Sequence, residues 1–314
     1  MLTMKGKEPV IGAIGLGGES VFLNVDHFHA PGETLHAKNR FVEAGGKAYN
    51  QAVAAARLGA NVRFFGAVGQ DSGGALCRSV LEAEGIVPVL QTIPHVNTAY
   101  ACILTDAGGE NQVTVCRGAA DCLSADFIRG QEAAIARCSH LLLGLECPLE
   151  ATVAALDLAK KHGIFTILNP APAIALDLDF LRSFDLITPN LQEAAVLLGL
   201  THTPEIRELG QRLLEAGLTN AVVTLGSRGS LLITPSRQLL FPALQVKAVD
   251  TTGAGDTFNA ALAVAISRGK PITEAIEFAT NASAWSVSRN HVLDSLPTVQ
   301  ELESNYRKVV PCPL

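Results

Sequence analysis

Asp-Thr-Thr-Gly-Ala-Gly-Asp-Thr-Phe, residues 250–258, stands between two segments of different pattern. Residues 246–249 before it are typical of the end of a strand, and the alanine-rich apolar run 260–266 after it favours a helix. Such a junction turns the N–H groups of Gly253, Ala254 and Gly255 outward at a helix N-terminus, where unpaired donors and the helix dipole attract an anion. Asp256 would lie within one turn of that anion. A plain glycine loop with an aspartate that stabilises the start of a helix would leave the same pattern.

Three further motifs stand at predicted helix starts or strand ends. Residues 45–50, Gly-Gly-Lys-Ala-Tyr-Asn, lead into an alanine-rich helix. Asn190 and Glu193 are three residues apart, which places an amide and a carboxylate on one face of a helix. Residues 224–229, Thr-Leu-Gly-Ser-Arg-Gly, follow a strand. Taken alone, each motif has an ordinary structural interpretation: a helix start, a capping pair and a strand-ending loop.

In their order along the chain the four motifs resemble the ribokinase-type (phosphofructokinase-B) carbohydrate kinases, and the similarity extends from about residue 11 to about residue 297. The resemblance implies that Asp256 is the general base on a sugar hydroxyl. It also implies that Gly253, Ala254 and Gly255 stabilise charge on the transferred phosphoryl group. Phosphoryl transfer depends on positioning and charge stabilisation more than on covalent chemistry, so the motif suits this reaction.

The same resemblance assigns the other site residues. The implied sugar-binding residues are Gly18, Ser20, Gly45, Gly46, Lys47, Asn50, Glu146 and Asp256. The implied nucleotide-binding residues are Asn190, Thr224, Gly226, Ser227, Gly229 and Asn281. Glu193 would organise Mg²⁺, largely through water, and Asp250, the Thr252 carbonyl and Ser295 would form a potassium site with loop 286–295. The implied cofactors are ATP and Mg²⁺, and K⁺ would be an activating ion.

Three places depart from the family pattern. The family carries G-S-x-N-x-D after the first strand, whereas residues 15–20 read Gly-Leu-Gly-Gly-Glu-Ser. Gly18 and Ser20 therefore replace an amide and a carboxylate that hold sugar hydroxyls, and we expect extra volume at Gly18 and a best substrate other than ribose. The family motif G-G-K-G reads Gly45-Gly-Lys-Ala48, and Tyr49 is expected to add bulk beside this sugar-binding motif. In the cation loop, His291 would be strained by a glycine-specific backbone angle, so we expect weak potassium activation.

Composition limits the classes of partner. The 314 residues are 48% hydrophobic and 17% charged, so a large core is available, and the net charge of −6 argues against nucleic acid or an anionic membrane as the main partner. The seven cysteines are odd in number and lack a C-x-x-C pair, which favours reduced thiols and a cytoplasmic location. No apolar run approaches the length of a membrane span.

The order of the predicted elements indicates the fold. Strands alternate with helices from residue 139 onward, which predicts a three-layer α/β/α sandwich with a mostly parallel central sheet. Strand-like segments at 20–25 and 35–42 and a hairpin at 98–104 and 111–117 predict a small β-sheet lid. We therefore expect an ATP- and substrate-binding α/β domain (1–14, 43–96 and 118–314) and a lid (15–42 and 97–117). The family resemblance further implies a homodimer through the lid.

The function that the motifs and the family resemblance imply is ATP-dependent phosphorylation of a primary hydroxyl of a sugar, ribokinase-like in acting on a pentose or a related compound. Two alternatives stay open. One is a kinase of nucleosides or other ribosyl compounds, and the other is a non-catalytic sugar sensor with a kinase fold. The intact Asp256 motif speaks against the sensor, whereas the altered sugar pocket keeps it open.

Overall fold

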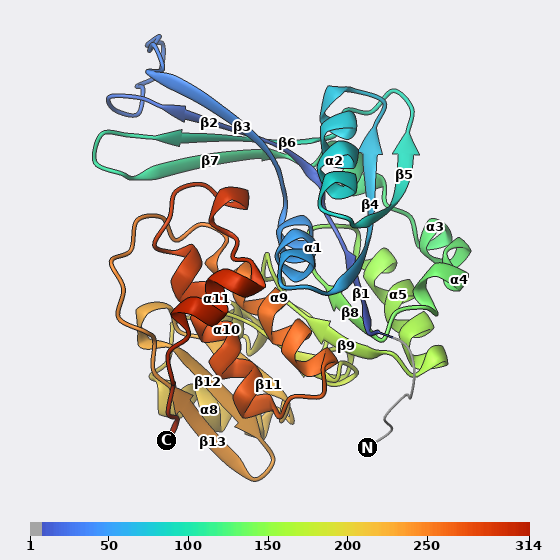
Figure 1. The fold of residues 1–314 in the computed structure, drawn as a ribbon, viewed down its shortest axis with the longest axis vertical. Coiled ribbons are helices and arrows are strands. Elements are labelled where there is room, and N and C mark those ends of the chain that lie inside the picture. The colour runs from blue at the N-terminus through green and yellow to red at the C-terminus, as the bar shows by residue number, and fades with distance from the viewer. Residues whose placement is uncertain (1–7) are drawn as a thin grey trace.

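The computed structural model describes residues 8–314, which form one large sheet and one small separate sheet (Figure 1). The large sheet has the strand order β14-β13-β12-β11-β10-β9-β8-β1-β4-β5. Its strands are β1 (Val10–Ile14), β4 (Asn61–Gly69), β5 (Val87–Ile93), β8 (His140–Leu143), β9 (Phe165–Leu168), β10 (Leu186–Ile187), β11 (Ala221–Thr224), β12 (Ser230–Thr234), β13 (Arg237–Phe241) and β14 (Cys312–Pro313). Strands β5 to β11 in this order are parallel, and β12, β13 and β14 extend the sheet in antiparallel pairs.

Helices cover both faces of the large sheet, so the sheet packs against two apolar cores. One core is built with α1 (Lys47–Arg57), α2 (Ser72–Ala83), α9 (Ala254–Ser267), α10 (Ile272–Ser286) and α11 (Val299–Asn305). The other is built with α3 (Ala125–Gly130), α4 (Glu132–Ile135), α5 (Leu149–His162), α6 (Leu178–Arg182), α7 (Leu191–Leu197) and α8 (Ile206–Glu215). The predicted three-layer sandwich is confirmed. The polar residues that follow the parallel strands meet at one edge of this sheet.

The small sheet is the lid, with the strand order β3-β2-β6-β7 (Figure 1). Its strands are β2 (Gly18–Asn24), β3 (Asn39–Gly45), β6 (Ala99–Thr105) and β7 (Asn111–Cys116). The predicted hairpin is β6–β7, and Asp106 Oδ1 accepts hydrogen bonds from two backbone N–H groups of its turn. Strand β3 starts at residue 39 rather than 35 and runs on to Gly45. As a result, only Gly46 separates the lid strand from helix α1.

Two parts of the large sheet differ from the sequence-based expectation. Residues 246–249 are not a strand, because they have no ladder partner; instead the Val249 N–H donates a hydrogen bond to the Val287 carbonyl at 2.7 Å. This irregular segment leads into α9. The second difference is that β13, β14 and β5 were not expected from the sequence. Strand β5 is one edge of the sheet. It contains Pro88, which an edge strand tolerates because one side of its backbone is unpaired.

Within residues 8–314, no helix combines the length and apolar character needed to cross a membrane. All seven cysteines are free thiols. The division into two domains at the predicted boundaries stays a prediction, and residues 1–7 of its first segment lie outside the described part of the chain.

Candidate active site

Helix α9 begins inside the Gly-Ala-Gly stretch that was singled out in the sequence. Gly253 is its N-cap and has φ 75°, a left-handed conformation that glycine adopts without strain. Gly253 also has no room for a side chain, since a Cβ there would lie 2.6 Å from Val292 Cγ1. The Thr257 N–H donates to the Gly253 carbonyl at 2.9 Å, which starts the helical ladder. The N–H groups of Gly255 and Asp256 precede that ladder and are available to an anion. The Ala254 N–H, which was also predicted to face an anion, instead donates to the Thr251 carbonyl at 3.3 Å.

The Asp256 carboxylate lies in the first turn of α9 and is 6% exposed. Asn50 Nδ2 donates to its Oδ2 at 2.9 Å, and Gln51 Nε2 donates to its Oδ1 at 3.3 Å. Both donors come from α1, which packs against α9. Burial raises the pKa of Asp256 above the ordinary aspartate value, while Lys47, Asn50 and Gln51 act to lower it. The result is a fixed, buried carboxylate with a raised proton affinity, which is what a general base requires.

Lys47 and Glu146 complete the charged group around this carboxylate. Glu146 Oε2 accepts a hydrogen bond from the Lys47 backbone N–H at 2.7 Å, at the N-terminus of α1. Burial raises the pKa of Glu146 to about 7, with a further contribution from the charge of Asp256. The charge of Asp256 is the largest cause that raises the pKa of Lys47, so this side chain stays an ammonium ion. A cation thus lies close enough to the Asp256 carboxylate to interact with its charge.

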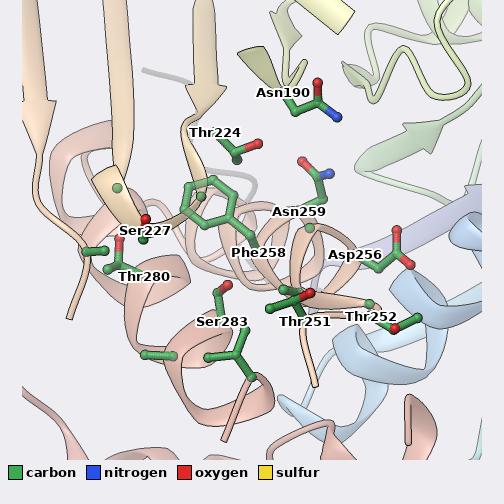
Figure 2. A pocket seen from close by; sticks show the side chains of 18 of the residues that line it. Asn190, Thr224, Ser227, Thr251, Thr252, Asp256, Phe258, Asn259, Thr280 and Ser283 are labelled. Carbon is green, nitrogen blue, oxygen red and sulfur yellow. The ribbon is translucent and has the colours of Figure 1, made fainter. Parts of the chain in front are cut away.

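A cavity of about 620 Å³ lies in front of Asp256 (Figure 2). Its wall contains residues that were predicted for the nucleotide, the anion, magnesium, potassium and the sugar: Asn190, Thr224, Gly226, Ser227, Gly229, Gly253, Ala254, Gly255, Asp256, Glu193, Thr252 and Lys47. Most of them lie at or after the ends of sheet strands or at the start of α9, and Lys47 is the first residue of α1. Motifs that are far apart in the sequence thus meet at one cavity by the carboxyl edge of the sheet.

Asn190 and Glu193 serve a structural role and also line this cavity. Asn190 Oδ1 accepts from the Glu193 N–H at 2.8 Å, and Glu193 Oε2 accepts from the Asn190 N–H at 2.8 Å. This capping box starts α7. Burial raises the pKa of Glu193. The pair is held rigid by its own hydrogen bonds, and its assignment to magnesium and nucleotide stays a prediction.

Asn281 does not reach the cavity, so its assignment to the nucleotide is corrected here. Its Nδ2 donates to the Glu277 and Arg307 carbonyls, and its Oδ1 accepts from the Arg307 N–H at 2.8 Å. Successive side chains of an α-helix point about 100° apart around its axis, so neighbouring Thr280 and Asn281 face different sides of α10. Thr280 and Ser283 line the cavity instead, and both are visible in Figure 2.

The predicted sugar residues gather where β2 and β3 of the lid meet α1. Ser20 lies opposite Glu43 in the β2–β3 pair, and a Cβ at Gly45 would be 2.9 Å from Ser20 Oγ and 3.8 Å from Asn50 Oδ1. Gly46 is the N-cap of α1. The side-chain oxygens of Ser20 and Asn50 therefore lie near each other, next to the hydrogen bond from Asn50 to Asp256.

Two expectations about this sugar pocket were wrong. Gly18 does not add volume, because a Cβ there would lie 2.5 Å from the Ala99 carbonyl oxygen and 2.8 Å from the Ala99 Cβ. Strand β6 occupies the space that a longer side chain would need. Tyr49 does not add bulk beside the sugar either: it is fully buried, its hydroxyl donates to the Cys77 carbonyl at 2.7 Å, and its ring packs against Phe64.

Comparison with known proteins identifies the family. The model of the pfkB family carbohydrate kinases matches residues 18–299. The ribokinase of Haemophilus influenzae is 38% identical over 282 residues, which cover 89% of this chain and 92% of the relative. The deoxyribokinase of Salmonella typhi is 32% identical over 295 residues, which cover 93% and 96%. The structure of Arabidopsis thaliana ribokinase complexed with ribose and ATP has a TM-score of 0.86 at 26% identity, covering 96% of this chain and 99% of that one.

The chain belongs to the pfkB family of carbohydrate kinases. The predicted resemblance and the predicted ATP-dependent carbohydrate kinase are thereby confirmed.

The cation loop of this kinase shows part of what was expected. His291 has φ 64°, the glycine-like angle that we predicted would strain it. Ser295 Oγ donates to the Val292 carbonyl at 2.8 Å, and Asp250 Oδ1 accepts from the Thr252 N–H at 2.9 Å. Across residues 8–314, no group of three or more histidine, cysteine, aspartate or glutamate side chains is placed to hold a metal ion. A potassium site at Asp250, Thr252 and Ser295 stays a prediction.

Several polar residues of the kinase site were missed in the sequence, among them Gln51, Thr280 and Asn259. Gln51 binds Asp256 and also donates to Asn169 Oδ1 at 3.2 Å. Thr280 lines the cavity, as described above. Asn259 lies three residues after Asp256 on α9 and lines the cavity; it is 2% exposed, and its Oδ1 has no hydrogen-bond partner (Figure 2). The spacing of three residues from Asp256 on one helix was the signal that could have revealed Asn259.

Proposed function

We propose that this kinase transfers the γ-phosphoryl group of ATP to a primary hydroxyl of a pentose or a related sugar, with Asp256 as the general base. The observation that carries the proposal is the position of Asp256. Its buried carboxylate stands at the N-terminus of α9, between the 620 Å³ cavity and the junction of lid strand β3 with α1. A proton acceptor and an anion site are thus adjacent, as an in-line transfer to a hydroxyl requires.

The proposed sugar site is supported by an unpaired hydrogen-bond acceptor. Asn50 Oδ1 is buried and has no hydrogen-bond partner, although its Nδ2 is bonded to Asp256. A buried acceptor without a donor is costly, so a ligand hydroxyl that supplies the donor would be held firmly. Ser20 and Gly45 lie on the same side of Asn50. A polyhydroxyl compound fits this group, with one hydroxyl at Asn50 and the reacting hydroxyl at Asp256.

The nucleotide side of the proposal rests on the cavity wall. ATP would lie along the loop of Thr224, Gly226, Ser227 and Gly229, with its phosphates toward Lys47 and the start of α9. Glu193 is the carboxylate on that wall. One carboxylate and the phosphates themselves form a suitable ligand set for Mg²⁺, which keeps most of its water. When bound, Mg²⁺ would neutralise part of the phosphate charge.

In the proposed reaction the residues of this chain have three tasks. Asp256 accepts the proton of the sugar hydroxyl as the hydroxyl oxygen attacks the γ-phosphorus, and the bond to the β-phosphate oxygen breaks. The N–H groups at the start of α9 stabilise the charge on the transferred group. The Lys47 ammonium, close enough to Asp256 to shift its pKa, adds a positive charge on the same side.

Other parts of the proposal concern assembly and location. We place the enzyme in the cytoplasm, with a small-molecule substrate and neither nucleic acid nor a membrane as partner. We also propose a homodimer through the lid, because edge strand β7 exposes Val113 (58%) and Val115 (53%). Light scattering of the wild type and of a Val113→Lys, Val115→Lys variant tests this: a dimer that the variant reduces to a monomer is expected.

The test of the function is ADP production with pentoses, hexoses and nucleosides as acceptors, followed by NMR assignment of the phosphorylated position. We expect a pentose to stimulate ADP production and to carry phosphate on its primary hydroxyl. Preference for a nucleoside would favour the ribosyl-compound kinase. A sugar that shifts the melting temperature without any ADP production would favour the sensor and overturn the proposal.

A further inference from the structure

Strand β3 of the lid carries a buried carboxylate that the reaction above does not use. Glu43 is 7% exposed. Its Oε1 accepts from the Val292 N–H at 3.3 Å and its Oε2 accepts from the Leu293 N–H at 3.1 Å. No lysine or arginine is bonded to it among the described residues. A buried carboxylate without a basic partner is costly, so these two backbone donors are what holds it in place.

The loop that Glu43 binds also forms part of the wall behind the anion site. The Val292 side chain packs against Gly253, where even a single added carbon would overlap it. At the start of the same loop, the Val287 carbonyl accepts hydrogen bonds from the N–H groups of Val249 and Asp250. The position of the loop therefore helps to fix the backbone of residues 249–253, which leads into α9.

A second contact joins the same strand to the same loop. The Phe41 ring stacks on the His291 ring with centroids 3.9 Å apart and an angle of 27° between the planes. His291 has φ 64°, a conformation that a non-glycine residue keeps only when its surroundings hold it there. Alternation along β3 puts Phe41, Glu43 and Gly45 on one face of the lid. The strand thus presents Gly45 to the sugar side and Glu43 to the loop.

We propose that Glu43 is a positioning residue that couples the lid to phosphoryl transfer. By accepting hydrogen bonds from the N–H groups of Val292 and Leu293, it holds Val292 against Gly253 and so fixes the anion site at the start of α9. Because Glu43 and Gly45 share one strand face, movement of β3 on sugar binding is transmitted to this loop. The inference rests on the proposed function, since it assigns a role within the same site.

The kinetic test compares Glu43→Gln and Glu43→Ala with a matched control. Glutamine keeps one acceptor oxygen and alanine keeps none, so the defect should be graded. We expect kcat for the best sugar to fall about tenfold in Glu43→Gln and further in Glu43→Ala, while KM for the sugar changes less than about twofold. The control is Glu19→Gln, a carboxylate that lies opposite Ala44 and therefore on the other face of the lid. We expect the control to keep wild-type kinetics.

Hydrogen exchange of the backbone amides provides a readout that does not depend on turnover. In the free protein, Glu43→Gln should speed exchange in both 287–296 and 250–256, whereas Glu19→Gln should not. Adding the sugar should slow exchange in 250–256 of the wild type and fail to do so in Glu43→Gln, even where a thermal shift shows that the variant binds it.

Several outcomes would overturn the inference. Equal kcat in Glu43→Gln and Glu19→Gln would do so, as would unchanged exchange in 250–256. A raised KM at constant kcat would make Glu43 a direct sugar contact instead. If the wild type phosphorylates no acceptor, the proposed function fails, and the exchange of the free protein still decides the link between Glu43 and the anion site.

Discussion

At the scale of single residues, the site depends on how burial changes the acidity of carboxyl groups. Asp256 and Glu146 are both forced toward higher pKa values by loss of water, and both lie near Lys47. Their partners differ, however. Asp256 accepts from two side-chain amides, whereas Glu146 accepts from the backbone at the start of α1. The first arrangement leaves a carboxylate that can exchange a proton with a ligand, as the proposed reaction requires, and the second fixes the helix start.

Replacing Asp256 with asparagine tests the base. Asp256→Asn keeps the shape of the side chain but cannot accept the hydroxyl proton, so kcat should fall on the order of 10²- to 10⁴-fold. The thermal shift with ADP should stay as in the wild type. Asp157→Asn, on an exposed position of α5, serves as the control and should keep wild-type turnover. A well-folded Asp256→Asn enzyme with near-normal kcat would contradict the assignment.

The raised pKa of Glu146 predicts a stability that depends on pH. An unfolded glutamate ionises near pH 4.5, whereas folded Glu146 does so near pH 7. Between these values the folded state keeps a proton that the unfolded state has released. Glu146 therefore lowers the free energy of unfolding as pH rises through this window, by at most about 1.4 kcal/mol per pH unit.

Urea unfolding of the wild type and of Glu146→Gln at pH 5, 6, 7 and 8 measures this contribution. Both proteins also contain buried His140, whose pKa is lowered to about 4 and whose contribution to stability changes with pH in the opposite direction. Subtracting the two free energies of unfolding removes this shared contribution and leaves that of Glu146. We expect the variant to gain stability relative to the wild type from pH 5 to 7 and then to level off. Glu303→Gln, on an exposed position of α11, should show no such trend. A pH-independent difference for Glu146→Gln would refute the shift.

At the scale of elements, the sequence predicted most of the site because its chemistry lies in short local motifs. The Gly-Ala-Gly stretch followed by an apolar run was sufficient to predict α9 and the position of Asp256 in its first turn. The three amide and glycine motifs were found for the same reason. They meet in one cavity because parallel strands share one carboxyl edge.

The errors arose where neighbours distant in the sequence decide the outcome. Gly18 suggested open space, but β6 approaches it, and Tyr49 next to the motif points into the core rather than the site. Asn281 was predicted to bind the nucleotide, but it bonds to Arg307, and the preceding residue of α10, Thr280, lines the cavity. Segment 246–249 has the composition of a strand but no partner. A local sequence pattern does not show which distant segments pack against these residues.

The loop that precedes α11 carries the prediction about potassium. His291 holds a left-handed backbone angle that costs on the order of 1–2 kcal/mol outside glycine, and the Phe41 ring is stacked on it. A loop held in this way has less freedom to turn its carbonyls toward an ion. We expect wild-type activity to rise less than about twofold between NaCl and KCl, whereas His291→Gly should respond more strongly.

His95 provides the matched control, because it also has a positive φ, 61°, in the loop between β5 and β6. His95→Gly relieves the same kind of strain away from the cation loop, so it should leave the ratio of activities in KCl and NaCl unchanged. Strong potassium activation of the wild type, with sodium inactive, would show that His291 does not limit the site.

At the scale of the whole molecule, the proposed reaction requires the lid and the sandwich to contact the same sugar. The sandwich supplies Asp256 and the lid supplies Ser20 and Gly45, with Asn50 at the start of α1 between them. A carboxylate at the Ser20 position could accept hydrogen bonds from two sugar hydroxyls, whereas the serine offers one hydroxyl group. Strand β6 also closes the space at Gly18. We therefore expect the lid to bind the sugar through fewer hydrogen bonds.

Substrate preference should reflect this loss. A site that hydrogen-bonds a substrate hydroxyl rejects analogues that lack it, and a site without that bond does not. We expect kcat/KM for 2-deoxyribose to equal or exceed that for ribose in the wild type, measured side by side at saturating ATP. Ser20→Asp returns a carboxylate to the lid face and should shift the ratio toward ribose by about tenfold. Ser79→Asp, on an exposed position of α2, should leave the ratio unchanged. If kcat/KM of the wild type is tenfold or more higher for ribose than for 2-deoxyribose, other lid groups bind the second hydroxyl, and the role given to Ser20 is wrong.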